Sequence, residues 1–127
     1  MKKCLFLIAL SLLLFSISNA APIWHPLGNN GPETMTEIIV PNSDNFRTTL
    51  TVDIPGFYVE EEMVKGTIYH HISIPVLNGG TLSEVGSPQL PVIARFIAIP
   101  PDRDPEIKII EQTEETFDGF NVYPVGR

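Results

Sequence analysis

The sequence predicts an all-β fold, arranged as an antiparallel sandwich or a barrel-like domain. In several stretches, apolar and polar residues alternate with a period of two, which is the pattern of half-buried strands. The chain holds 12 prolines and 9 glycines among 127 residues, and they separate these stretches at spacings of about ten residues. After the first 20 residues, no stretch shows the apolar period of an amphipathic helix. Short strands separated by turn residues are typical of sandwiches and barrels.

The clearest strands lie in the middle of the chain. The stretch 49–54 (sequence TLTVDI) alternates apolar residues with threonine and aspartate. A β-hairpin is predicted after it, with strands over 57–64 and 68–74. Gly66 lies between them and can adopt the positive φ of a tight turn. Glu61 interrupts an otherwise apolar face of the first hairpin strand.

Residues Val92–Ile99 are predicted to form the central and most buried strand. They are apolar at both odd and even positions except at Arg95. This is the pattern of a strand covered on both faces. If Phe96 is fully buried there, Phe96→Ala should cost about 3–5 kcal/mol. Two further strands are predicted over Glu106–Gln112 and Phe117–Tyr123.

The start of the chain has the order of a cleavable secretory signal peptide. Lys2 and Lys3 form a basic start, residues 5–17 are mainly apolar, and small residues lead up to Ala20. Cleavage is therefore expected between Ala20 and Ala21. The apolar run is shorter than the roughly 20 residues that a membrane-spanning helix needs. The sequence therefore favours export by the Sec pathway, to the periplasm or the outside of the cell, over a membrane anchor.

On this basis the chain is expected to divide into three parts. Residues 1–20 form the signal peptide, residues 21–45 a loosely ordered segment, and residues 46–127 the β domain. Prolines and glycines punctuate the segment 21–45, and only Glu37–Val40 is predicted to be a short strand there.

The composition of the mature chain excludes several classes of function. The only cysteine, Cys4, lies in the predicted signal peptide, so no disulfide, thiolate metal site or cysteine nucleophile is expected afterwards. Without Lys2 and Lys3, six basic residues face 15 acidic ones, a net charge of −9. Nucleic acids and anionic membranes both require a basic surface. No nucleic acid and, after cleavage, no membrane is therefore expected as a partner.

His70 and His71 are the residues that most invite a catalytic or metal-binding interpretation. Adjacent residues of a strand point to opposite faces, so they cannot chelate one metal ion from a regular strand, and packing or surface positions are favoured. The acidic runs 60–62 and 114–115 lack the spacing of a calcium loop and are interpreted as solvated faces. The loop 102–104 is expected to be exposed to proteases. A Ser-His-Asp set stays open, although no Gly-x-Ser-x-Gly elbow is present. No catalytic residue, metal or cofactor is predicted.

Residues 80–100 carry a more specific signal than the composition does. Their sequence, GTLSEVGSPQLPVIARFIAIP, contains a glycine loop, a Gly-x-Pro-x-Leu-Pro motif and an apolar stretch with one basic residue. In this order, these features closely resemble the N-terminal prodomain of gingipain-type cysteine peptidases. The resemblance extends from about Phe46 to Pro124. The motif residues that carry it are Gly86, Pro88, Leu90, Pro91, Arg95 and Pro100.

This resemblance implies an all-β prodomain that helps a following cysteine peptidase domain to fold and covers its catalytic cleft. The partner would be that peptidase domain, in cis and outside this chain. The family is expected to maintain latency with a basic residue on a loop that begins a few residues beyond Pro124. Arg127 is the candidate for this residue that the chain offers. The resemblance also implies that the β domain is incomplete and that the chain is truncated or part of a longer precursor.

Two functions are therefore consistent with the sequence. The first is a secreted, non-catalytic prodomain that acts as a folding aid and steric inhibitor of a gingipain-like cysteine endopeptidase. The second is a secreted or cell-surface β module that binds a partner and is not attached to a peptidase, because a fold alone does not fix a function.

Overall fold

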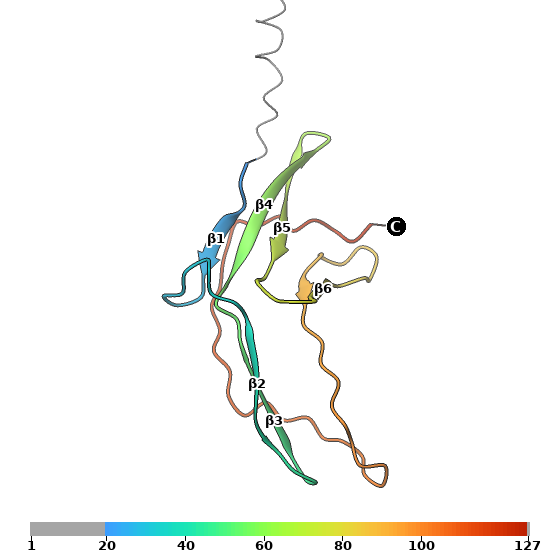
Figure 1. The fold of residues 1–127 in the computed structure, drawn as a ribbon. Coiled ribbons are helices and arrows are strands. Elements are labelled where there is room, and N and C mark those ends of the chain that lie inside the picture. The colour runs from blue at the N-terminus through green and yellow to red at the C-terminus, as the bar shows by residue number, and fades with distance from the viewer. Residues whose placement is uncertain (1–19, 127) are drawn as a thin grey trace, which may run out of the picture.

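The computed structural model describes residues 20–126. Residues 1–19 of the predicted signal peptide and the candidate residue Arg127 lie outside this range. The described part contains strands and no helix (Figure 1). The strands are β1 (Ile23–Pro26), β2 (Glu37–Ser43), β3 (Thr48–Asp53), β4 (Gly56–Val64), β5 (Thr67–Ser73), β6 (Gly80–Thr81) and β7 (Pro91–Val92). The all-β class is thus confirmed, while closure into a sandwich or barrel stays a prediction.

The largest sheet has three antiparallel strands in the order β1-β4-β5. Strands β4 and β5 form the predicted hairpin, and its register runs from Val64 opposite Thr67 to Tyr58 opposite Ser73. The two-residue turn is made by Lys65 at φ 50° and Gly66 at φ 82°. Positive φ at both central residues matches the twist of the flanking strands. The sequence prediction of this hairpin is confirmed.

The Lys65-Gly66 turn allows a direct test of this geometry. Gly66→Ala should lower the free energy of unfolding by about 1–2 kcal/mol, because L residues with a Cβ rarely adopt positive φ. A Cβ added there would contact nothing within 4 Å, so the cost comes from the backbone alone. Denaturant unfolding of the mature chain measures it. Lys65→Asn should change stability in the opposite direction, because asparagine tolerates positive φ. Equal stability of all three proteins would contradict the turn.

The antiparallel register sorts the side chains of this sheet onto two faces. Phe57, Val59 and Met63 share one face, as their common parity in the sequence predicts. Val59 is only 4% exposed, and Pro55 just before β4 is fully buried. Glu61 lies on the same face, directly opposite His70 of β5. The charged residue that interrupts the apolar face therefore has a polar partner across the strands.

A second antiparallel hairpin, β2–β3, projects away from this sheet (Figure 1). Strand β3 confirms the predicted strand at 49–54, and β2 extends the short one predicted at Glu37–Val40. The register shifts between Ile39 and Asn42, around Pro41, which has no N–H to donate to a ladder. The segment 21–45 thus holds β2 and also β1, a strand that the sequence did not predict.

Asp44 fixes the turn of the β2–β3 hairpin. Its Oδ1 atom accepts the backbone N–H groups of Phe46 at 2.7 Å and Arg47 at 2.8 Å. These two donors, first Phe46 and then Arg47, lower the pKa of Asp44 below its usual value because they stabilise the carboxylate form. The hairpin turn therefore favours the ionised form of Asp44.

The prediction of a buried central strand at Val92–Ile99 is wrong. Only Pro91 and Val92 form a strand, β7, which pairs with Gly80 and Thr81 of β6. Phe96 is 107% exposed, so the predicted cost of Phe96→Ala does not hold for this structure. The physical reason is that a strand needs a partner backbone, and within residues 20–126 no strand lies beside the chain after Val92.

The prediction of two regular strands near the C-terminus is also wrong. The stretch Glu106–Gln112 is irregular, and its isoleucines at 107, 109 and 110 are 93%, 76% and 78% exposed. In the stretch Phe117–Tyr123, Val122 forms an isolated parallel bridge with His70 of β5. The C-terminal part of the chain therefore touches the main sheet at its β5 edge without forming a regular strand.

Candidate functional site

Residues 120–125, here called the C-terminal segment, are held between β5 and the loop 82–90. On the β5 side, the N–H of His70 donates to the carbonyl of Asn121 at 2.8 Å, and the N–H of Tyr123 donates to the carbonyl of His70 at 2.9 Å. The side-chain amide of Asn121 also donates to the carbonyl of Ile68 at 3.0 Å. The C-terminal segment thus adds to the free edge of the sheet.

The loop 82–90 holds the C-terminal segment from its other side. The N–H of Gln89 donates to the carbonyl of Tyr123 at 2.8 Å, and the N–H of Val125 donates to that of Ser87 at 2.9 Å. The N–H of Gly86 donates to the carbonyl of Val125 at 3.1 Å. Gly86 has φ 85°, a conformation that suits glycine. The Gly-x-Pro-x-Leu-Pro motif therefore positions backbone groups that bind the C-terminal segment.

The motif residues have distinct places in this loop. Pro88 forms an antiparallel bridge with Pro124, at the contact with the C-terminal segment. Leu90 accepts the N–H of Leu82 at 2.9 Å through its carbonyl, and Pro91 pairs with Thr81 in the β6–β7 ladder. Gly86 and Pro88 thus lie where the loop contacts the C-terminal segment. Leu90 and Pro91 lie where the two ends of the loop come together.

His70 is the side chain that joins β5 to the C-terminal segment. Its Nδ1 accepts the backbone N–H of Asn121 at 2.9 Å. Its Nε2 lies 3.6 Å from Oε1 of Glu61, and the imidazole is only 14% exposed. The ring also packs edge-to-face on Phe120, with 5.5 Å between the ring centroids. One histidine therefore contacts the segment by its backbone, a ring nitrogen and its aromatic face.

His71 binds the same segment on the opposite face of the sheet. Its ring stacks on Tyr123 at 4.7 Å, and its Nε2 lies 2.5 Å from Oε2 of Glu62. The two histidines thus point to opposite faces, as predicted from their adjacency in a strand. Each has an acidic partner on β4, so Glu61 and Glu62 of the run 60–62 are paired as well as exposed.

An aromatic cluster packs Phe117 and Phe120, at the start of the C-terminal segment, onto the sheet. The ring of Phe57 on β4 lies 4.9 Å from that of Phe117 and 6.0 Å from that of Phe120, in edge-to-face geometry. His25 of β1 stacks on Phe57 at 5.1 Å and meets Phe120 edge-on at 5.3 Å. Aromatic pairs in such arrangements stabilise beyond the area they bury. This cluster therefore links β1, β4 and the C-terminal part of the chain.

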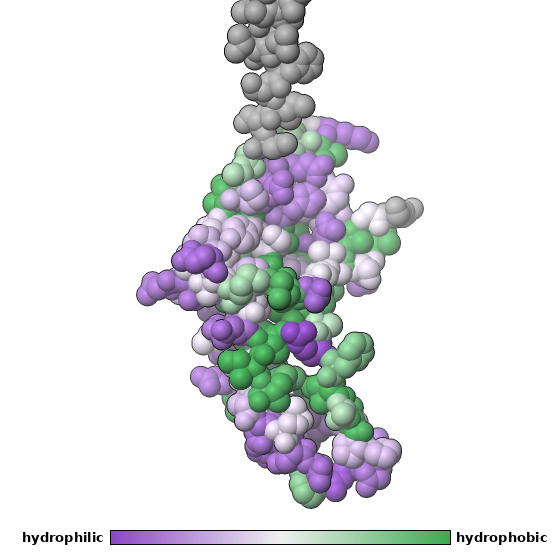
Figure 2. All heavy atoms as spheres, in the orientation of Figure 1, coloured by the Kyte–Doolittle hydropathy of each residue, from purple (hydrophilic) through white to green (hydrophobic). Residues whose placement is uncertain are grey.

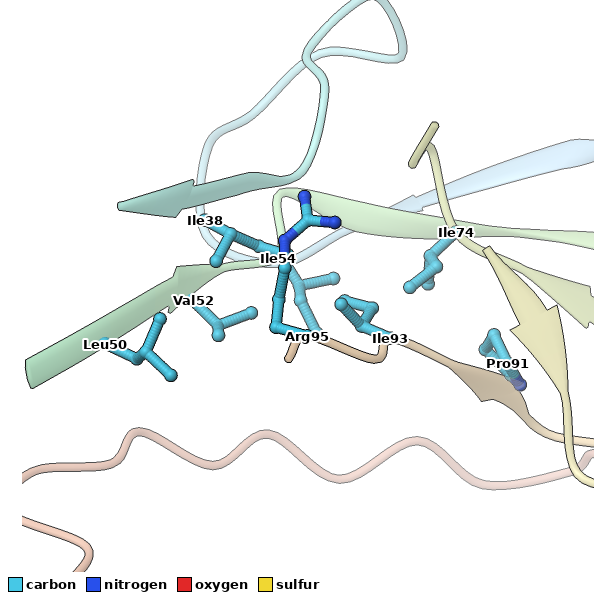
Figure 3. Close-up of a pocket in the computed structure, with 8 residues that line it drawn as sticks. All are labelled: Ile38, Leu50, Val52, Ile54, Ile74, Pro91, Ile93 and Arg95. Atoms are coloured by element: carbon cyan, nitrogen blue, oxygen red, sulfur yellow. The ribbon is translucent and has the colours of Figure 1, made fainter. Parts of the chain in front are cut away.

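An open apolar trough lies between the β2–β3 hairpin and the chain after β7. In Figure 2, apolar side chains gather over this half of the molecule, and in Figure 3 side chains from both walls point toward a common space. The space has a volume of about 470 Å³. The residues that line it are Ile38, Leu50, Val52, Ile54, Ile74, Pro91, Ile93 and Arg95.

The trough continues between the β2–β3 hairpin and residues 95–98. At its far end, a contact joins the two sides. A second hollow beside it is lined by Val40 on one wall and by Phe96 and Ile97 on the other, with Arg95 shared by both. Beyond this hollow, the guanidinium of Arg103 lies 4.7 Å from the centre of the Phe46 ring. The exposed loop 102–104 therefore contacts the turn of the β2–β3 hairpin.

The remaining residues singled out in the sequence are exposed. Ala20 and Ala21, at the predicted cleavage point, are exposed, and so are Arg95 and Pro100 of the motif. Glu114 and Glu115 are exposed too. Among residues 20–126, no three histidine, aspartate or glutamate side chains gather in a group that could hold a metal ion.

Sequence reasoning missed two features of this site. One is the contact between the C-terminal segment and the motif loop, which only tertiary structure brings together. The other is the pairing of Glu61 with His70. The sequence did contain a signal for that pairing, since a two-residue turn at Lys65-Gly66 places residue 61 opposite residue 70.

The geometry defines a class of protein before any comparison with others. It is a small all-β module with an exposed apolar trough and a C-terminal segment held between β5 and the loop 82–90. In the part of the chain that the structure covers, no helix is long and apolar enough to cross a membrane.

Comparison with protein families assigns this module. The model of the C25 peptidase propeptide family (Propeptide_C25) matches residues 36–126. The chain therefore belongs to this family, as its resemblance to gingipain-type prodomains indicated. A propeptide is a non-catalytic part of a peptidase precursor. No curated protein and no solved structure matches the chain.

Proposed function

We propose that this chain is the exported prodomain region of a gingipain-like cysteine endopeptidase precursor, and that it assists the folding of the peptidase domain and keeps it latent. Under this proposal, cleavage after Ala20 yields the mature chain. The partner is the peptidase domain in cis, and the β domain of residues 46–127 is completed by the polypeptide that follows in the precursor.

The open apolar trough is the observation that carries this proposal. Its walls include Leu50 at 36% and Val52 at 50% exposure, and Phe96 of the adjoining hollow is 107% exposed. Contiguous exposed apolar surface marks a site of interaction with other polypeptides. The neighbouring chain at 93–99 forms no strand, and an extended backbone with free N–H and C=O groups can add a strand from another segment. Both features support a polypeptide that covers this side of the domain.

A steric inhibitor needs no reactive group of its own. It needs a folded, soluble scaffold, an area to bury against its target and a side chain presented as a substrate would be. The mature chain offers the scaffold and the apolar area, and its net charge of −9 keeps copies apart in solution. The C-terminal segment leads directly to the position of Arg127, the candidate residue for presentation to the cleft.

Inhibition of the following peptidase domain in trans tests this function. The mature chain, residues 21–127, should bind the isolated peptidase domain but inhibit hydrolysis of a fluorogenic peptide poorly. A longer chain that continues past Arg127 through the next loop should inhibit at least tenfold more strongly, because it adds the presented basic residue and further buried area. Replacement of that basic residue by alanine should remove most of the gain.

The alternative is a secreted or cell-surface binding module without a peptidase. If neither the mature nor the longer chain binds or slows the peptidase domain, the prodomain function is wrong and this alternative replaces it. The gene sequence downstream of residue 127 distinguishes the two as well. A peptidase domain with a histidine and a cysteine supports the prodomain, and an adhesive repeat supports the binding module.

A further inference from the structure

The imidazole of His70 is placed so that its charge controls the attachment of the C-terminal segment. Nδ1 accepts the N–H of Asn121 at 2.9 Å, which requires an unprotonated Nδ1 with a free lone pair. The neutral ring then carries its proton on Nε2, the nitrogen that faces Glu61 at 3.6 Å. The attached state of the segment thus selects one neutral tautomer of His70.

Protonation removes this acceptor. In the imidazolium both ring nitrogens are donors, so the Nδ1–H would point at the N–H of Asn121 and the hydrogen bond would become a repulsive contact. The His70 side chain is 14% exposed, whereas Asn121 is exposed. The loss therefore comes mainly from two N–H groups that face each other where a hydrogen bond had been. Histidine is the side chain whose charge normally changes between about pH 5 and 8.

We propose that His70 is a pH-sensitive latch that holds the C-terminal segment on β5 at neutral pH and releases it on acidification. The latch acts on the chain that leads to residue 127. Its role in loosening an inhibitory prodomain rests on the proposed function, whereas the latch itself is a property of the mature chain alone.

The other groups around His70 do not restore the lost acceptor. Glu61 on β4 attracts the imidazolium, but its side chain is 56% exposed and such pairs are weakened by solvent and salt. It also faces Nε2 and not Nδ1. From the C-terminal segment, Phe120 presents a ring edge-to-face. His25 of β1 contacts the same Phe120 ring at 5.3 Å and makes no hydrogen bond with Asn121 among the described contacts.

His71 contacts the same segment in a different way. Its ring stacks on Tyr123 and its Nε2 meets Glu62, and among the described contacts neither of its ring nitrogens accepts a hydrogen bond from the C-terminal segment. This difference between the two neighbours makes His71 the matched control.

The sign of the pH dependence follows from the tautomer. The segment binds best when His70 is neutral, so its attachment weakens as acidification protonates the ring. The strands β4 and β5 pair through their own backbones and do not depend on Nδ1 of His70. Release should therefore be local, with the hairpin kept intact.

Amide hydrogen exchange of the mature chain, measured by NMR at pH 7.5 and pH 5.5, tests the latch. After correction for the intrinsic rate at each pH, protection of the Asn121 and Tyr123 amides should fall at least tenfold at the lower pH. The amides of Glu60 and Tyr69, which face the partner strand in the β4–β5 ladder, should keep their protection. Equal protection of Asn121 and Tyr123 at both pH values would overturn the proposal.

Two variants isolate the responsible ring. In His70→Asn, the Oδ1 atom replaces Nδ1 as an acceptor that does not titrate, so protection of Tyr123 should be independent of pH. In His71→Asn, the fall in protection at pH 5.5 should remain. If His71→Asn abolishes the pH dependence, or His70→Asn keeps it, the latch is not His70. These outcomes are read from the mature chain, so they stand whether or not the peptidase is inhibited.

Discussion

Phe57→Ala is expected to lower the free energy of unfolding of the mature chain by about 3 kcal/mol, a large part of the stability of a small domain. Phe57 lies on β4 at the centre of the aromatic cluster and contacts the rings of His25, Phe117 and Phe120. Removing its ring leaves a cavity under the chain that precedes the C-terminal segment. Chemical denaturation monitored by circular dichroism measures the change.

Phe96→Ala is the matched control for this loss. It removes the same ring from a side chain that is 107% exposed, so the stability of the mature chain should change by no more than about 0.5 kcal/mol. If Phe96→Ala instead destabilises more than Phe57→Ala, the buried central strand suggested by the sequence is right and the exposed position of Phe96 is wrong.

The parts of the fold that the sequence predicted correctly are local. The β4–β5 hairpin rests on alternation within each strand and on the turn at Lys65-Gly66, and all of this information lies within 18 consecutive residues, Gly56–Ser73. Strand β3 follows from the same alternation. The opposite orientation of His70 and His71 follows from strand geometry alone. Each of these inferences needs no knowledge of distant residues.

The wrong predictions concern stretches whose environment is set by other segments. An apolar pattern on both parities, as in Val92–Ile99, indicates residues that favour burial, but it does not state what buries them. The described part of the chain places no strand against this stretch, so it is extended and exposed. The C-terminal stretch was likewise predicted as a regular strand, whereas its contacts with β5 and the motif loop come from residues about 35 to 50 positions away.

Val52→Arg is expected to abolish the latency of the complete precursor while leaving the mature chain folded. Val52 lines the trough and is 50% exposed, so a polar residue is tolerated there when the trough is open. In the precursor, the added guanidinium would occupy the space meant for the covering polypeptide. It would also lie beside Arg95, the charged residue of the same lining, and would be buried without a partner.

A buried unpaired charge costs several kcal/mol, and about 2.7 kcal/mol corresponds to a hundredfold change in affinity. Inhibition of the peptidase domain by the longer chain should therefore weaken by at least about 100-fold in Val52→Arg, measured as the inhibition constant with a fluorogenic peptide. The mature Val52→Arg chain should keep its denaturation midpoint within the range of a surface substitution, which separates lost contact from lost folding.

Met63→Arg provides the control for charge and size. Met63 is 70% exposed and lies near the β4–β5 turn, outside the trough, so the same substitution there should leave inhibition unchanged. Equal inhibition by the Val52→Arg and unsubstituted longer chains would show that the trough stays open in the precursor. The eight residues that line the trough leave a space of about 470 Å³ that the described chain does not fill. In that case, this apolar surface between the β2–β3 hairpin and residues 91–98 would bind a partner other than the peptidase precursor.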